Sequence, residues 1–292
     1  SDVCSSDLPE ADLAQAQSVS ETVLESLEAS SAQLTAVAGM AKLSIAGAGI
    51  MGRPGVAARL FDTLARLGIN LRLIATSEVK VSCLIEAAQA TKALRATAAA
   101  FELTDQQLRQ APLPCSPDAP PVRGVALDRD QAQVSVRRVP DRPGAAAAIC
   151  RALADAGISL DTIVQSERTH GSAEQLSRDI SFTLRRGERA TAEQALLPVL
   201  RQWPGAYLED GAPIARVSAV GAGMACTAGT AARMFRALAD AGINIEMIAT
   251  SEIRTSCVVA EEQGVLALQA VHAAFGLGGS VEHRAEGTEA PA

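Results

Sequence analysis

Two features of this chain could hold a small charged ligand: glycine-rich turns ahead of helices, and acids close to those turns. The segment Gly47–Gly52 (GAGIMG) has the G-x-G-x-x-G spacing that seats a pyrophosphate on a helix N-terminus. The segment Val139–Gly144 (VPDRPG) places Asp141 just before an expected helix, and Asp161 lies on the following strand. Free N–H groups at a helix start favour a carboxylate, and nearby acids favour an ammonium. The candidate ligands are therefore a dinucleotide and an α-amino acid, which carries both groups.

The dinucleotide interpretation is the weaker one. A related segment, 221–226 (GAGMAC), lacks the third glycine. The strand after the helix also turns straight back through a Ser-Glu pair, where a dinucleotide-binding unit continues into a crossover helix. A purely structural interpretation stays open beside the amino-acid one, with Asp141 capping its helix and Asp161 solvated on a strand.

The sequence lacks the cysteine and histidine patterns that metal sites and hydrolytic centres require. The six cysteines have no C-x-x-C spacing and the three histidines are not near a nucleophile motif, so we expect no metal site, no hydrolytic centre and buried, inert thiols. These residues are Cys4, Cys83, Cys115, Cys150, Cys226, Cys257, His170, His272 and His283.

Composition narrows the partners. The 292 residues carry a net charge of −7 and only 2% aromatic side chains, which disfavours nucleic acid and anionic membranes. No apolar run is long enough to cross a bilayer, and the N-terminus shows no signal peptide. We therefore expect a cytoplasmic protein with no nucleic-acid or membrane partner.

The chain contains an internal repeat. Residues 47–86 align with 221–260 without a gap, with 20 identities in 40 positions, and residues 139–167 form a more distant copy. Each copy predicts the order strand, helix, strand, strand, helix, with one more strand expected. The strands are expected at 41–46, 69–77 and 79–86; at 131–138, 158–166 and 179–185; and at 213–220, 243–251 and 253–260. The helices are expected at 54–67, 89–101, 143–156, 190–202, 228–241 and 263–275, with Pro54 and Pro143 in the first helical position and Gly68, Gly157 and Gly242 at helix ends.

This order predicts an α+β fold of tandem ferredoxin-like βαββαβ units, with antiparallel sheets and helices on one face. Residues 1–38 are interpreted as the remnant of a first copy in a truncated protein, with a helix at 10–29, a weak strand at 32–37 and no element at 1–8. The second copy spans 39–109, and a proline-rich linker spans 110–121. The third copy spans 122–211 and the fourth spans 212–280, with the strand 122–128 as a candidate to join the fourth copy instead of the third. A tail, 281–292, follows.

The segments 47–86, 139–167 and 221–260 resemble the ACT domains at the C-terminus of aspartate kinases, in the arrangement with four tandem ACT domains. The kinase signature Lys-x-Gly-Gly-Ser/Thr does not occur. The resemblance therefore implies a regulatory region that is catalytically silent alone. No cofactor is expected here, with ATP and Mg belonging to the missing kinase domain.

The resemblance also implies lysine and/or threonine as feedback effectors, an upstream kinase domain as partner, and a homo-oligomer formed by ACT pairing. A stand-alone amino-acid sensor acting on another enzyme remains the alternative.

The resemblance implies effector-binding residues at interfaces between paired copies. The third copy supplies the helix start and strand, the fourth copy supplies the partner wall, and the same positions in the second copy have lost their partner. These residues are Asp141, Gly144, Ala145, Ala146, Ser159, Leu160, Asp161, Gln165, Ser166 and Glu167; Asn244, Ile245, Thr250, Ser251 and Glu252; and Asn70, Leu71, Thr76, Ser77 and Glu78. Two departures are Ala228, where the other copies have proline, and a longer polar segment at 169–177.

Overall fold

The computed structural model describes residues 8–26, 34–47, 50, 53–77, 79–108, 120–165, 176–251 and 253–278. Its helices are α1 (Leu13–Ser26), α2 (Val56–Arg66), α3 (Ala90–Ala100), α4 (Ala145–Asp155), α5 (Arg189–Leu200), α6 (Thr230–Asp240) and α7 (Gly264–Ala274). Its strands are β1 (Met40–Ala46), β2 (Leu73–Ser77), β3 (Lys80–Glu86), β4 (Gly124–Pro140), β5 (Thr162–Gln165), β6 (Ser177–Arg185), β7 (Tyr207–Glu209), β8 (Ile214–Val220), β9 (Met247–Thr250) and β10 (Arg254–Ala260).

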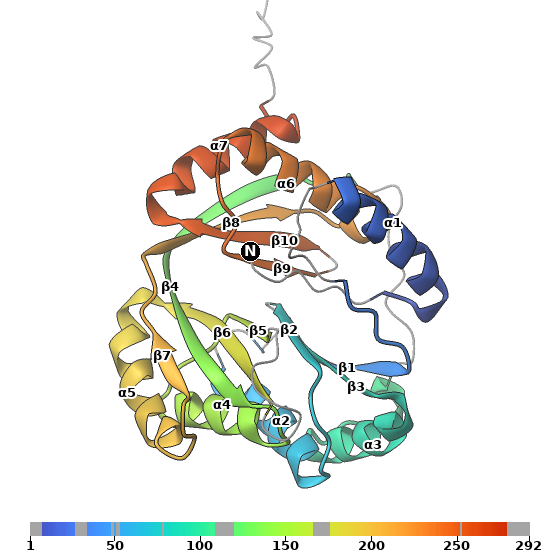
Figure 1. Cartoon of the computed structure of the whole chain (residues 1–292), viewed down its shortest axis with the longest axis vertical. Helices are drawn as coiled ribbons and strands as arrows, with labels where there is room; N and C mark the ends of the chain where they lie inside the picture. The colour runs from blue at the N-terminus through green and yellow to red at the C-terminus, as the bar shows by residue number, and fades with distance from the viewer. Residues whose placement is uncertain are drawn as a thin grey trace, which may run out of the picture.

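These elements confirm the expected α+β class. All the strand pairs are antiparallel, in the order β1-β3-β2-β5-β6-β4-β8-β10-β9, with β7 beside β4. Figure 1 shows the helices of each copy outside its strands, so that the strands of the fourth copy face those of the second and third. A dinucleotide-binding unit needs parallel strands joined by crossover helices, and the dinucleotide interpretation is therefore wrong.

Several local expectations need correction. The expected strand at 32–37 is not formed over residues 34–37, and 32–33 lie outside the described residues. Expected helix 10–29 begins with a 3-10 turn and is described as far as Ser26. The prolines Pro54 and Pro143 lie two residues before the first helical residue, because a left-handed glycine follows each of them. The described helices therefore start later than the proline rule predicts.

The second and third copies share one hydrophobic core. Strand β2 pairs with β5, and helix α2 packs on α4. Phe61 and Leu64 from α2 belong to the same buried cluster as Ile149 and Leu153 from α4. The expectation that the second copy had lost its partner is therefore wrong. The third copy pairs with the second through β5 as well as with the fourth through β4. The edge strand β2 pairs with β5, and this pairing lets the helices of the two copies bury their apolar side chains in one core.

The fourth copy has a separate core, with Met234, Leu238, Cys257 and Val271 fully buried in it. It is joined to the third copy by β4, which is shared between them. Residues 124–128 of β4 pair with β8, and residues 131–136 and 139–140 pair with β6, while Gln131 pairs with both. The register of β4 against β8 is irregular between Asp128 and Gln131, and the pairing with β6 begins at Gln131. The fourth copy is thus held to the rest of the sheet through a continuous strand.

The cysteines divide into two groups. Burial raises the pKa of Cys83, Cys150 and Cys257 to about 12, as expected for buried thiols that stay protonated. Cys226 is half-buried and disulfide-bonded, so the expectation of an inert, buried thiol is wrong there. Cys4 and Cys115 lie outside the described residues.

The repeat supplies a matched pair of glycines for testing the junction between the third and fourth copies. A Cβ at Gly221 would lie 2.1 Å from the carbonyl oxygen of Pro121, whereas no described atom lies within 4 Å of a Cβ at Gly47, the equivalent position. We expect Gly221→Ala to destabilise the chain by about 2 kcal/mol or more, because backbone must move. Gly47→Ala should be close to neutral. Denaturant unfolding followed by circular dichroism measures both, and equal stability of the two variants would contradict the close approach.

Candidate functional site

A narrow cavity lies at the start of α4, between the third copy and the second. The turn Pro143–Gly144 leads into α4, and Gly144 has the left-handed φ of 94° that the turn requires. No side chain caps the helix. The N–H of Ala145 donates to the carbonyl oxygen of Arg142 at 3.3 Å, and the first-turn residue Ala146 lines the cavity without a capping side chain. This helix start can take a carboxylate.

Asp141 lies beside this helix start, and its side chain is only 4% exposed. One carboxylate oxygen accepts a 2.9 Å hydrogen bond from Nδ2 of Asn70 in the second copy. The other accepts a 2.8 Å hydrogen bond from Nε of Arg178 on β6. Asp141 therefore does not cap α4, and the purely structural interpretation is wrong for it. It joins the two copies across the cavity.

Arg178 was not identified in the sequence. It is 8% exposed, and its guanidinium also donates a 3.0 Å hydrogen bond to the carbonyl oxygen of Arg72. The one available signal was an arginine near the start of a strand in which apolar residues alternate with polar ones. Its partner could not be foreseen, because Asp141 lies 37 residues away in the chain.

Gln165, at the end of β5, supplies an unused acceptor. It is 5% exposed, and its Nε2 donates to the carbonyl oxygen of Leu71 at 3.4 Å. Its Oε1 is buried without a hydrogen-bond partner, and the residue lines the cavity at the α4 start. An unpaired buried carbonyl oxygen costs free energy unless a donor reaches it. An ammonium in the cavity would be such a donor.

The cavity is small in this conformation, about 20 Å³. This volume holds about one water molecule and no amino acid. A larger ligand therefore needs a wider cavity, and the neutral contact of Asn70 with Asp141 joins the two copies across it.

A second cavity of about 30 Å³ lies at the start of α2. The internal repeat relates it to the first, because Gly55 precedes α2 as Gly144 precedes α4. Leu160 and Asp161 from the third copy line it, together with residues of the second. Asp161 is not solvated, since its carboxylate pairs with Arg216 on β8 of the fourth copy.

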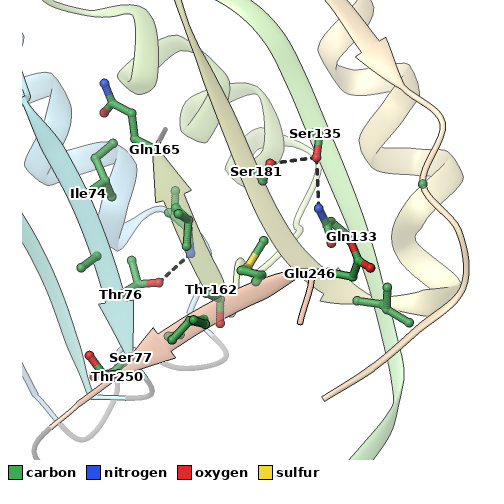
Figure 2. Close-up of a pocket in the computed structure, with 18 of the residues that line it drawn as sticks. Ile74, Thr76, Ser77, Gln133, Ser135, Thr162, Gln165, Ser181, Glu246 and Thr250 are labelled. Atoms are coloured by element: carbon green, nitrogen blue, oxygen red, sulfur yellow. Dashed lines mark hydrogen bonds between the residues drawn. The ribbon is translucent and has the colours of Figure 1, made fainter. Parts of the chain in front are cut away.

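The described fourth-copy residues do not line the cavity at the α4 start, but Thr250 and Ser251 line a separate small pocket together with Asp161. Asn244, Thr250 and Ser251 line a cleft of about 850 Å³ between the facing sheets, and Ile245 packs on the fourth copy's own core. Figure 2 shows Thr250 in this cleft near Ser77. Asn70 and Leu71 of the second copy provide the wall instead.

Some site residues remain unplaced or lie apart. Ser159 is half-buried and lines neither helix-start cavity, whereas Thr76 and Ser77 line the second. Ser166, Glu167, Glu252 and Glu78 lie outside the described residues.

Thr76 fastens β2 to β5. Its hydroxyl accepts a 2.7 Å hydrogen bond from the N–H of Ile163, which is the dashed line at Thr76 in Figure 2. The same hydroxyl donates to the carbonyl oxygen of Asp161 at 3.4 Å. Both helix-start cavities lie between copies that this strand pair holds together, so Thr76 positions the walls of both.

Two further observations concern the described part of the chain. It contains no cluster of three or more metal-ligating side chains. None of its helices is long and apolar enough to span a membrane.

Comparison with known proteins identifies the class. Sequence profiles described as ACT domain match residues 43–101, 132–197 and 217–275, together more than half of the chain. The chain therefore belongs to the ACT domain family, and the resemblance inferred from its motifs is confirmed.

The relatives that it matches are aspartate kinases. It is 45% identical over 157 residues to an aspartokinase of Thermus thermophilus, covering 53% of this chain and 38% of that protein. It is 41% identical over 162 residues to an aspartate kinase of Pseudomonas fluorescens, covering 56% and 38%. The crystal structure of aspartate kinase from Synechocystis matches with a TM-score of 0.85 and 45% identity, covering 97% of this chain and 47% of that one. The chain spans about two fifths of the length of these curated relatives.

The repeat offers a matched control for the strand pair. We expect Thr76→Val to destabilise the chain by about 1–3 kcal/mol, because the N–H of Ile163 loses its buried acceptor. Thr250→Val changes the equivalent residue of the fourth copy, which is exposed, and should cost little. Thermal and urea unfolding of both variants measures the difference. A Thr76→Val chain as stable as the Thr250→Val chain would contradict the fastening role.

Proposed function

We propose that this chain is the effector-binding region of an aspartate kinase, which mediates feedback inhibition by lysine and/or threonine in the cytoplasm. The kinase domain lies upstream in the same protein and holds ATP and Mg, whereas this region needs no cofactor. The proposal is supported by relatives named as aspartate kinases and by the match to the Synechocystis enzyme over 97% of this chain.

The ligand assignment rests on one observation: the same cavity offers a group that favours a carboxylate and a group that favours an ammonium. The uncapped start of α4 favours an α-carboxylate, and Oε1 of Gln165 offers an unpaired acceptor to an α-ammonium. The side chain of the amino acid then points to the wall formed by Asn70 and Asp141. A zwitterionic amino acid satisfies all of these groups at once.

Regulation follows from where the cavity lies. Because its walls come from two copies, a ligand that opens the contact of Asn70 with Asp141 changes how these copies sit together. Effector binding stabilises the open placement only to the extent that the ligand prefers it, typically by 1–3 kcal/mol. That preference biases the joined kinase domain.

Self-association is part of the proposal. The strands equivalent to β9 in the other copies are β2 and β5, and these pair with each other. Within the described residues β9 ends the sheet. We expect β9 to pair with an equivalent strand of a second chain. Sedimentation equilibrium of this chain should show a concentration-dependent dimer, and a monomer at all concentrations would contradict the pairing.

A stand-alone sensor acting on another enzyme is the alternative. Reading the coding sequence upstream of residue 1 separates the two, because a continuous kinase domain in frame supports the proposal and its absence supports the alternative. Both functions require amino-acid binding.

Gln165 is the residue with which to test that binding. We expect Gln165→Leu to weaken the binding of the effector by about tenfold or more, because a buried hydrogen bond to an ammonium is lost. Gln131→Leu is the matched control, since Gln131 also has a buried, unpartnered Oε1 but does not line the cavity. Calorimetric titration with lysine, threonine and other aspartate-derived amino acids measures both. Binding unchanged in the Gln165→Leu variant would overturn the assignment.

A further inference from the structure

We infer that Arg178 selects the charge class of the effector, so that the cavity at the α4 start takes an amino acid with an uncharged side chain and rejects a cationic one. The inference rests on the proposed function, because it assumes that an amino acid binds there. It names a residue that the motifs did not suggest.

The first step is the charge in the cavity wall. Asp141 is the only acid among the described residues that line the cavity, and two arginines, Arg142 and Arg178, line it as well. The Asp141 carboxylate is already paired with Arg178 at 2.8 Å and bonded to Asn70 at 2.9 Å. Its charge is therefore neutralised by a residue of the protein itself.

The second step is the strength of that pairing. The side chains of Arg178 and Asp141 are 10% and 4% exposed, so water screens the pair little. Arg178 is held from its other side by the carbonyl oxygen of Arg72 in the second copy, at 3.0 Å. Displacing the guanidinium would leave a buried charge without its partner, which is strongly unfavourable.

The consequence differs for the two expected effectors. The side-chain ammonium of lysine would enter a cavity whose described acid already has a cation, and it would lie close to two arginines. The hydroxyl of threonine brings no charge and can exchange hydrogen bonds with Asn70. Selection then comes from an unfavourable interaction with the wrong ligand.

The test changes Arg178 to an uncharged side chain of similar length. In Arg178→Met, Asp141 keeps Asn70 but loses its cation, so the lysine ammonium can take the vacated place. We expect the lysine affinity to rise relative to the threonine affinity by about tenfold or more. Arg151→Met is the matched control, because Arg151 pairs with Asp62 across the same two copies without lining the cavity. It should leave the ratio unchanged.

Two more variants protect the test against misfolding. Arg178→Lys retains a cation beside Asp141 and should keep the wild-type ratio. Arg178→Met combined with Asp141→Asn removes both charges, which leaves no buried ion unpaired, and should show no gain in lysine affinity. A lysine gain in this double variant would overturn the inference, since the gain would not come from Asp141.

The failure of the inference is distinct from the failure of the proposed function. Calorimetric titrations of the whole chain in which neither amino acid binds would contradict the proposed function. Binding of lysine that Gln165→Leu weakens and Arg178→Met leaves unchanged would show lysine in this cavity despite Arg178, and would overturn the inference alone. Threonine binding weakened by Gln165→Leu, with the lysine gain in Arg178→Met, supports both.

Discussion

The edge-to-edge pairing of β2 with β5 is the constraint on which the rest of the structure depends. It merges two related copies into one sheet and one hydrophobic core, and it sets the start of each copy's first helix against the other copy. Without it the helix starts at Gly55 and Gly144 would face water. With it each becomes the floor of a cavity that only two copies together enclose.

The internal repeat made the local elements predictable. Aligned glycines and alternating apolar residues placed the described helices and strands of three copies to within a few residues, because these signals are local. The weak strand expected near residue 34 lacked a repeat partner, and it is not formed there. Where the three copies showed the same pattern, the sequence was enough to predict the local helices and strands.

The partner of each copy could not be predicted. Similar strand edges in every copy make each a candidate for every other, and their choice depends on packing between residues far apart in the chain. The assignment of Asn244 to the wall at Asp141 failed for that reason, although Asn70 at the equivalent position was named. Arg178 was missed because a basic residue in a strand has no local signature of the acid that it will meet.

The strand β4 has a mechanical consequence. Because the single strand β4 is hydrogen-bonded both to β8 of the fourth copy and to β6 of the third, the two copies are not joined by a flexible linker. A rotation between them would have to be absorbed as twist of that strand, and we expect it to concentrate in the stretch after Asp128, where the register against β8 is irregular. The third and fourth copies would then move together, so that a small displacement of one is passed directly to the other.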